Sequence, residues 1–140
     1  MNKFYQKFSN NGFFVHKNFI DKNYVEKILK EIKTAKKVDK YYDKKNNIRR
    51  IERLYNKGIY LSNLNNKVEF FLKKIFKKKF HIFKDKYNAK PPNGEGFFAH
   101  YDGVFFFLNK KNQYKKGWYE YAKVFVNVLI ALDDCNKRNG

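Results

Sequence analysis

The spacing of apolar residues changes part of the way along this chain, and that change limits the folds open to it. Over residues 22–36 the apolar residues recur at the 3.6-residue spacing of one helix face, and Asp21 is a good N-cap for that helix. A second helical stripe follows Ser62, which we expect to be its N-cap. From Phe80 onward the spacing is instead that of strands.

Four segments are predicted to be strands and two to be exposed loops. The predicted strands are residues 12–19, 80–90, 97–102 and 123–132, and the predicted loops are the polar stretches 36–47 and 109–117. Helices dominate the first half and strands the second, which favours an α+β chain. We expect a single domain over residues 1–140, whose strands begin a double-stranded β-helix (a cupin-like jelly roll) and leave it incomplete.

The composition excludes several other classes of protein. Hydrophobic residues make up 43% of the 140 residues, which is too apolar for a disordered tail. The single cysteine, Cys135, excludes an intrachain disulfide and suits a reducing compartment. The longest apolar run, residues 124–132, is broken by Asn127 and is far shorter than the roughly 20 residues of a membrane helix. We therefore expect a soluble, cytoplasmic protein with no membrane partner.

The net charge of +19 suggests attraction to nucleic acid, but the make-up of that charge favours a simpler explanation. Only four of the 32 basic residues are arginines, the residue that nucleic-acid readers use for bidentate contacts. Lys, Asn, Ile, Phe and Tyr are all abundant and share adenine- and thymine-rich codons. A biased genome accounts for this mixture with a solvated lysine surface, so we expect no specific nucleic-acid partner.

One tripeptide, His100-Tyr101-Asp102, has residue types and spacing that suit metal chemistry. On an extended strand, residues two apart project from the same face, so the imidazole and the carboxylate can reach one point. These are two of the three ligands of the 2-His-1-carboxylate facial triad of non-haem Fe(II) sites. With three histidines and seven aspartates in the chain, such a pair also arises by chance, so its neighbours matter.

Three segments together resemble the phytanoyl-CoA dioxygenase family. The segment FKDKYNAKPPNGEGFFAHYDG, residues 83–103, resembles that family's iron-binding region, in which Asn-x-Lys-Pro leads through a glycine-rich loop into His-x-Asp. The segment VNVLIALDDCNKRNG, residues 126–140, is similar to its following signature of a hydrophobic strand, an acidic turn and Asn-Gly. The segment GFFVHKNFID, residues 12–21, is similar to its opening, whereas residues 35–62 match no part of the family.

The resemblance implies an Fe(II)- and 2-oxoglutarate-dependent dioxygenase that uses dioxygen to hydroxylate an unknown small-molecule substrate. His100 and Asp102 would be metal ligands. Asn88 is the first candidate for a contact to 2-oxoglutarate and Lys84 the second, although both are equally well explained as ordinary strand-surface residues. Tyr101 stands where the family often has glutamine, which puts any contact from the middle position in doubt.

The resemblance also implies residues that this chain does not supply. In the family, a second histidine ligand and a basic residue that binds 2-oxoglutarate follow the Asn-Gly turn, and neither His16 nor His81 matches a ligand position. We therefore expect the chain to be the N-terminal portion of such an enzyme, inactive as a fragment. Two alternatives stay open, namely a lysine-rich nucleic-acid-binding module and a non-catalytic relic of the fold.

Overall fold

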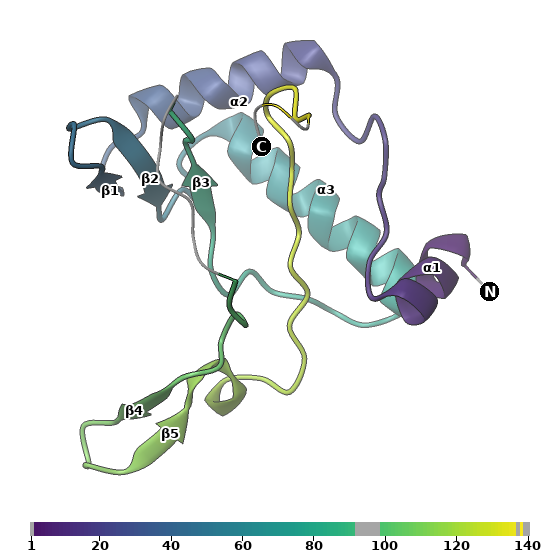
Figure 1. Ribbon diagram of the computed structural model, residues 1–140. Helices are drawn as coiled ribbons and strands as arrows, with labels where there is room; N and C mark the ends of the chain where they lie inside the picture. Colours follow the sequence, from purple (N-terminus) through teal and green to yellow (C-terminus); the bar gives the residue numbers. More distant parts are fainter. Residues whose placement is uncertain (1, 92–98, 137, 139–140) are drawn as a thin grey trace. The chain divides into compact units, whose positions relative to one another are not determined.

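The chain forms two compact units, residues 1–94 and residues 95–140 (Figure 1). The computed structural model describes residues 2–91, 99–136 and 138. Within these residues, helices combine with two small antiparallel sheets, which confirms a mixture of helix and sheet compatible with α+β. The jelly roll is not seen in the described ranges, and both it and the single domain stay predictions.

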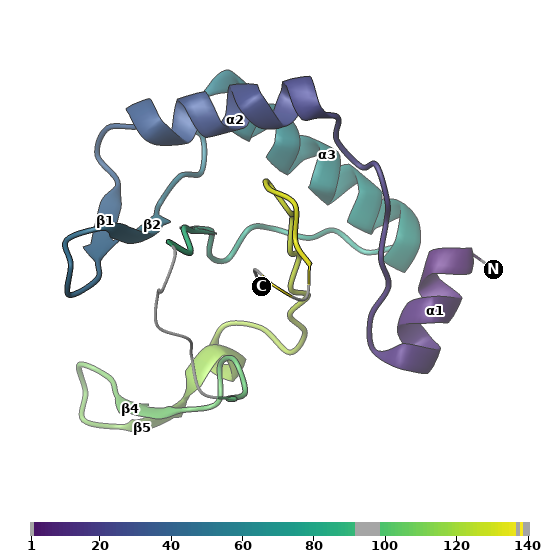
Figure 2. The ribbon, with the colours of Figure 1, turned by 45° about the horizontal axis from the view of Figure 1, so that its top comes forward.

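The first unit packs two helices and a three-stranded antiparallel sheet, with a third helix at one end. Its helices are α1 (Lys3–Asn11), α2 (Lys22–Thr34) and α3 (Ile59–Phe76), and its strands are β1 (Asp39–Tyr42), β2 (Ile48–Glu52) and β3 (Lys86–Asn88), in the order β1-β2-β3. Helices α2 and α3 lie next to each other in both ribbon views (Figures 1 and 2). The buried core is aliphatic and comprises Ile28, Ile32, Ile51, Leu54, Leu61, Leu64, Leu72 and Ile75.

Helix α2 follows the sequence prediction closely. Asp21 caps it, and its carboxylate accepts a hydrogen bond from the Tyr24 N–H at 2.8 Å. Ile28 and Ile32, four residues apart on the predicted apolar face, are its buried residues. The helix ends at Thr34, two residues before the predicted end, and the Thr34 hydroxyl donates back to the carbonyl of Lys30 at 3.0 Å.

Helix α3 begins three residues before Ser62, so the predicted cap is wrong. Its N-cap is Gly58, which has no side chain to offer, and the carboxylate of Glu31 on α2 takes over that role. Glu31 accepts hydrogen bonds from the N–H groups of Tyr60 at 3.0 Å and Leu61 at 2.9 Å. A Cβ atom at Gly58 would lie 2.2 Å from this carboxylate, so the absence of a side chain makes the contact possible.

The Glu31 carboxylate also affects Tyr24 in the same packed region. The Tyr24 hydroxyl donates to the carbonyl of Tyr60 at 3.0 Å. Burial first, and then the negative charge of Glu31, raise the pKa of Tyr24 above its usual 10.0. Because the folded-state pKa is raised, this group stabilises the fold fully below about pH 10 and loses that contribution at more alkaline pH.

Three further predictions for the first unit differ from the structure, two of them wholly and one in part. Residues 36–47, expected to be a loop, contain β1 and the turn of a hairpin, in which Asp43 accepts the Asn47 N–H at 2.8 Å. That bond, followed by one from the Asn47 side chain, lowers the pKa of Asp43. The expected strand at 12–19 is irregular chain after α1, and the rings of Phe14 and Phe19 pack on Phe71 of α3. Of the expected strand 80–90, only β3 is formed.

The second unit is built around one short hairpin. Strands β4 (Phe106–Leu108) and β5 (Tyr114–Lys116) pair antiparallel and lead into the 3-10 turn η1 (Gly117–Glu120). Strand β5 lies in the predicted loop 109–117. The predicted buried strand 123–132 is wrong, because no partner pairs with it in the described residues, and Leu129 is 94% exposed. Of the predicted strand 97–102, residues 97–98 lie outside the described ranges and 99–102 form no strand.

The contact between Glu31 and the start of α3 should make the effects of substitutions at Glu31 and Gly58 on the free energy of unfolding non-additive. We expect Glu31→Ala to lower the free energy of unfolding by about 1–2 kcal/mol, because two N–H groups lose a charged acceptor. Gly58→Ala should cost a similar amount by displacing the same carboxylate. Chemical denaturation of the double variant should then give less than the sum of the two losses.

The matched control is Glu26→Ala, which removes an exposed carboxylate from the same helix and should change stability by about 0.5 kcal/mol or less. Strict additivity of Glu31→Ala and Gly58→Ala would contradict the shared contact.

Candidate functional site

His100 and Asp102 approach each other in the second unit. The His100 Nε2 and Asp102 Oδ1 atoms are 3.4 Å apart, and the two side chains are 60% and 42% exposed. They lie where the chain turns rather than on an extended strand, so the predicted closeness is found but the predicted backbone is not. An imidazole nitrogen and a carboxylate oxygen thus face each other within reach of solvent.

Two glycines fix the backbone directly after this pair. Gly103 has φ +77°, and a Cβ there would lie 2.8 Å from the ring of Trp118. The N–H of Trp118 donates to the Gly103 carbonyl at 3.2 Å. A Cβ at Gly117 would approach the same carbonyl oxygen to 2.0 Å, which only glycine avoids. The turn bearing Asp102 is therefore held against Gly117 and Trp118.

These three residues were missed by the sequence reasoning, although a signal for each was present. Asp102-Gly103 is a common turn dipeptide, and Gly117 directly precedes the chain's single tryptophan. The Trp118 ring also packs on Phe125, with ring centroids 5.4 Å apart. Glycine is often found where another side chain packs closely on the backbone, because a Cβ atom would clash there.

Asn127 explains the polar interruption of the apolar run 124–132. Its side-chain amide donates to Asp102 Oδ2 at 3.4 Å, a long hydrogen bond, while Oδ1 of the same carboxylate faces His100. The two oxygens of Asp102 therefore have different neighbours. A partner of this kind orients a carboxylate, as outer-sphere partners of metal ligands do.

The two predicted 2-oxoglutarate contacts lie in the first unit. Lys84 has its Nζ atom 3.3 Å from Oε1 of Glu52, whose side chain is only 11% exposed. The same oxygen lies 3.1 Å from Nε of Arg50. Asn88 lies in β3, opposite Arg50 of β2, with its side chain exposed. Lys84 thus already neutralises a buried acid, and the assignment of both residues to 2-oxoglutarate stays a prediction.

Another histidine and the residues of the acidic turn make structural contacts. The ring of His16 stacks on Phe4 at 5.2 Å and meets Phe71 edge-on at 5.0 Å, within an aromatic cluster. At the acidic turn, the Asp134 N–H donates to the Asp133 side chain at 2.8 Å and the Cys135 thiol to the Asp133 carbonyl. Within the described part of the chain, no group of three or more histidine, cysteine or acidic side chains could hold a metal ion.

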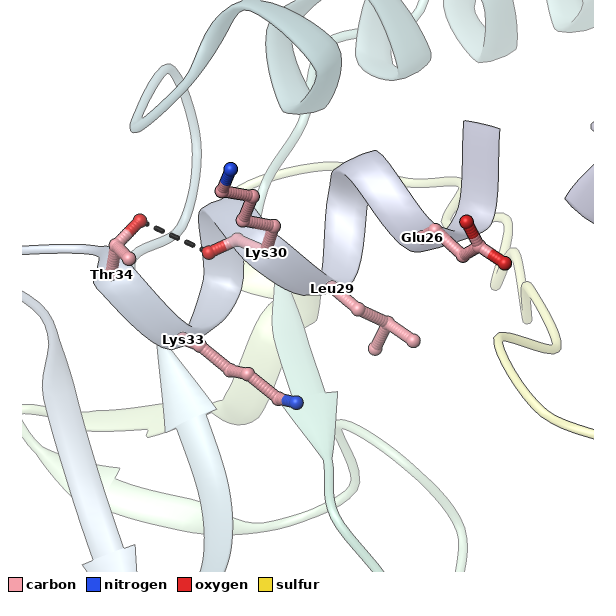
Figure 3. Close-up of a pocket in the computed structure, with 5 residues that line it drawn as sticks. All are labelled: Glu26, Leu29, Lys30, Lys33 and Thr34. Atoms are coloured by element: carbon pink, nitrogen blue, oxygen red, sulfur yellow. Dashed lines mark hydrogen bonds between the residues drawn. The ribbon is translucent and has the colours of Figure 1, made fainter. Parts of the chain in front are cut away.

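Two hollows of the first unit are lined by residues other than the predicted site residues. Figure 3 shows one of about 340 Å³, lined by Glu26, Leu29, Lys30, Lys33 and Thr34, all from α2. Because one helix supplies all of these side chains, it is a shallow groove on that helix. Another, of about 220 Å³, lies between α2 and the sheet and is mainly aliphatic. Neither is lined by Lys84 or Asn88.

Comparisons of the chain with protein-family models, with curated proteins and with solved structures found no match. Among the helices of the described residues, none has the length and apolar character needed to span a bilayer.

The packing of Trp118 on Gly103 gives a direct test of the turn. Gly103→Ala should shift the emission of Trp118, the single tryptophan, because the added Cβ forces the ring away. We also expect a loss of about 1–2 kcal/mol from the positive φ angle. Fluorescence spectra and urea denaturation measure the two effects.

Gly12→Ala is the matched control. Gly12 has nearly the same φ, +76°, but a Cβ there has no neighbour within 4 Å. It should lower stability through backbone strain and leave the tryptophan emission unchanged. An unchanged emission in Gly103→Ala would show that the turn is not held as described.

Proposed function

We propose that His100 and Asp102 are two protein ligands of Fe(II) in a 2-oxoglutarate-dependent dioxygenase of the phytanoyl-CoA dioxygenase type. The observation that carries this proposal is the 3.4 Å separation of Nε2 and Oδ1 on a turn held by glycine contacts. The resemblance of residues 83–103 to the family's iron-binding region supports the same assignment. The same resemblance implies a jelly-roll fold.

The residues present fit this metal in their chemistry. Neutral imidazole and carboxylate are donors that non-haem Fe(II) takes, and they fill two of the three protein positions of a facial triad. Neighbouring donors around an octahedral ion with bonds of about 2.1 Å lie roughly 3 Å apart, close to the separation of this pair. Both side chains are accessible enough for an ion to reach them.

Three further residues would position the two metal ligands. Gly103 and Trp118 hold the turn, and Asn127 holds one oxygen of Asp102 so that the other faces His100. Bound Fe(II) would supply the redox chemistry that couples decarboxylation of 2-oxoglutarate to hydroxylation of a C–H bond. Asn88 is the first candidate contact for 2-oxoglutarate. Lys84 is the second, and it would have to exchange its pairing with Glu52 for the cosubstrate.

The metal assignment can be tested by titrating the chain with Fe(II) under nitrogen and measuring binding by calorimetry. We expect weak binding, because two protein donors do not enforce a facial geometry. His100→Ala and Asp102→Ala should each abolish it. His81→Ala and Asp134→Ala remove the same groups elsewhere and should leave it unchanged. Tight, stoichiometric binding that survives His100→Ala would refute the assignment.

The role given to Asn127 predicts a smaller effect at a residue that does not touch the metal. Asn127→Ala should weaken Fe(II) binding by about tenfold, as is usual for partners of metal ligands. Paramagnetic broadening of the His100 ring signals in NMR spectra should persist in this variant and vanish in Asp102→Ala. Binding equal to that of the unchanged chain would show that the Asn127 contact has no part in the site.

A further inference from the structure

The division into two units shows that the positive charge is unevenly placed. Residues 1–94 contain 25 basic and 8 acidic side chains, whereas residues 95–140 contain 7 and 5. A codon bias acting on the whole gene would load both units with lysine alike. The excess in the first unit therefore calls for an explanation that is specific to that unit.

Within the first unit, many of these lysines gather where α1 packs on the end of α3. The contact is aromatic, since Phe76 of α3 lies 5.0 Å from Phe8 and 6.1 Å from Tyr5 of α1, between ring centroids. We define the basic end as the exposed lysines around this contact, which are Lys3, Lys7, Lys73, Lys74, Lys77, Lys78 and Lys79. No acidic residue occurs in residues 1–20 or 70–84, and Glu69, four residues before Lys73 on α3, is the acidic residue that adjoins this set along the sequence. The seven lysines therefore outnumber the acidic residues beside them in the sequence.

Beside the basic end, three apolar side chains are exposed to solvent. Phe14 lies in the aromatic cluster, with its ring centroid 5.1 Å from that of Phe4, and its neighbours Phe13 and Val15 are 64% and 70% exposed. The half-buried Phe14 ring packs on the helices, while the side chains on either side of it in the sequence are exposed. On α3, Phe70 is 60% exposed beneath the ammonium group of Lys74, 4.6 Å from its ring centroid.

We propose that this surface attaches the protein to an anionic lipid membrane, with Phe13 and Val15 inserted among the acyl chains. Lysines around exposed apolar residues are typical of surfaces that bind anionic bilayers. Val15 has no ring to stack on a base, and the basic end contains no arginine, which both disfavour nucleic acid. A second copy of the chain would bring like charges together. Attachment of this kind needs no helix that spans the bilayer.

Sedimentation of the whole chain with lipid vesicles tests this proposal. It should bind vesicles of phosphatidylcholine mixed with phosphatidylserine, and not phosphatidylcholine alone. Lys78→Gln with Lys79→Gln should weaken binding about 30-fold, since each lysine near an anionic surface contributes about a factor of five. The control pair, Lys110→Gln with Lys111→Gln, removes two exposed charges from the second unit and should have little effect.

The apolar contribution needs its own variant. Phe13→Ser with Val15→Ser should release the protein from the mixed vesicles at moderate salt, where screening leaves insertion as the main attraction. Circular dichroism should show unchanged melting, because both side chains are exposed. Failure to bind the mixed vesicles, equal effects of the two lysine pairs, or full binding by the Phe13/Val15 variant would each overturn the proposal. Preference for a single-stranded RNA oligonucleotide over the mixed vesicles would also overturn it, in favour of a nucleic-acid surface.

Discussion

One carboxylate, that of Glu31, joins the two helices on which the first unit is built. The first turn of any helix has N–H groups without partners in the helix itself, and α3 has a glycine where a capping side chain would stand. Glu31 reaches across from α2 to accept two of these N–H groups. These two hydrogen bonds tie the first turn of α3 to α2. Leu61 and Leu64 of α3 and Ile28 and Ile32 of α2 all belong to the buried core.

In the second unit, the corresponding contact is between backbone atoms and involves no charged side chain. Few of its apolar side chains are buried, and its order comes from glycines that let two chain segments touch. The carbonyl of Gly103 lies against Gly117 and accepts the N–H of Trp118. Asp102 directly precedes Gly103 in the sequence. The contact of Gly103 with Gly117 and Trp118 therefore positions a proposed metal ligand.

The sequence allowed correct predictions where the determining residues lie close together along the chain. Helix α2 carries its cap, Asp21, and its apolar stripe within a few turns, and both were found. The start of α3 was misplaced because its cap comes from Glu31, about thirty residues earlier. The segment 123–132 was misjudged because an apolar run becomes a buried strand only if another strand pairs with it. The closeness of His100 and Asp102 was foreseen, while the turn that produces it depends on Gly117 and Trp118, which are distant in sequence.

The contact between Gly103 and Gly117 separates the hairpin from the residues before it. Strands β4 and β5 lie between Gly103 and Gly117 in the sequence, so the contact of these two glycines brings the two ends of the hairpin together. Extending such a loop costs little, since the entropy of closure grows only slowly with length. A change in the length of residues 104–116 should therefore leave the separation of His100 and Asp102 unaltered, because both residues lie before the point at which the hairpin closes.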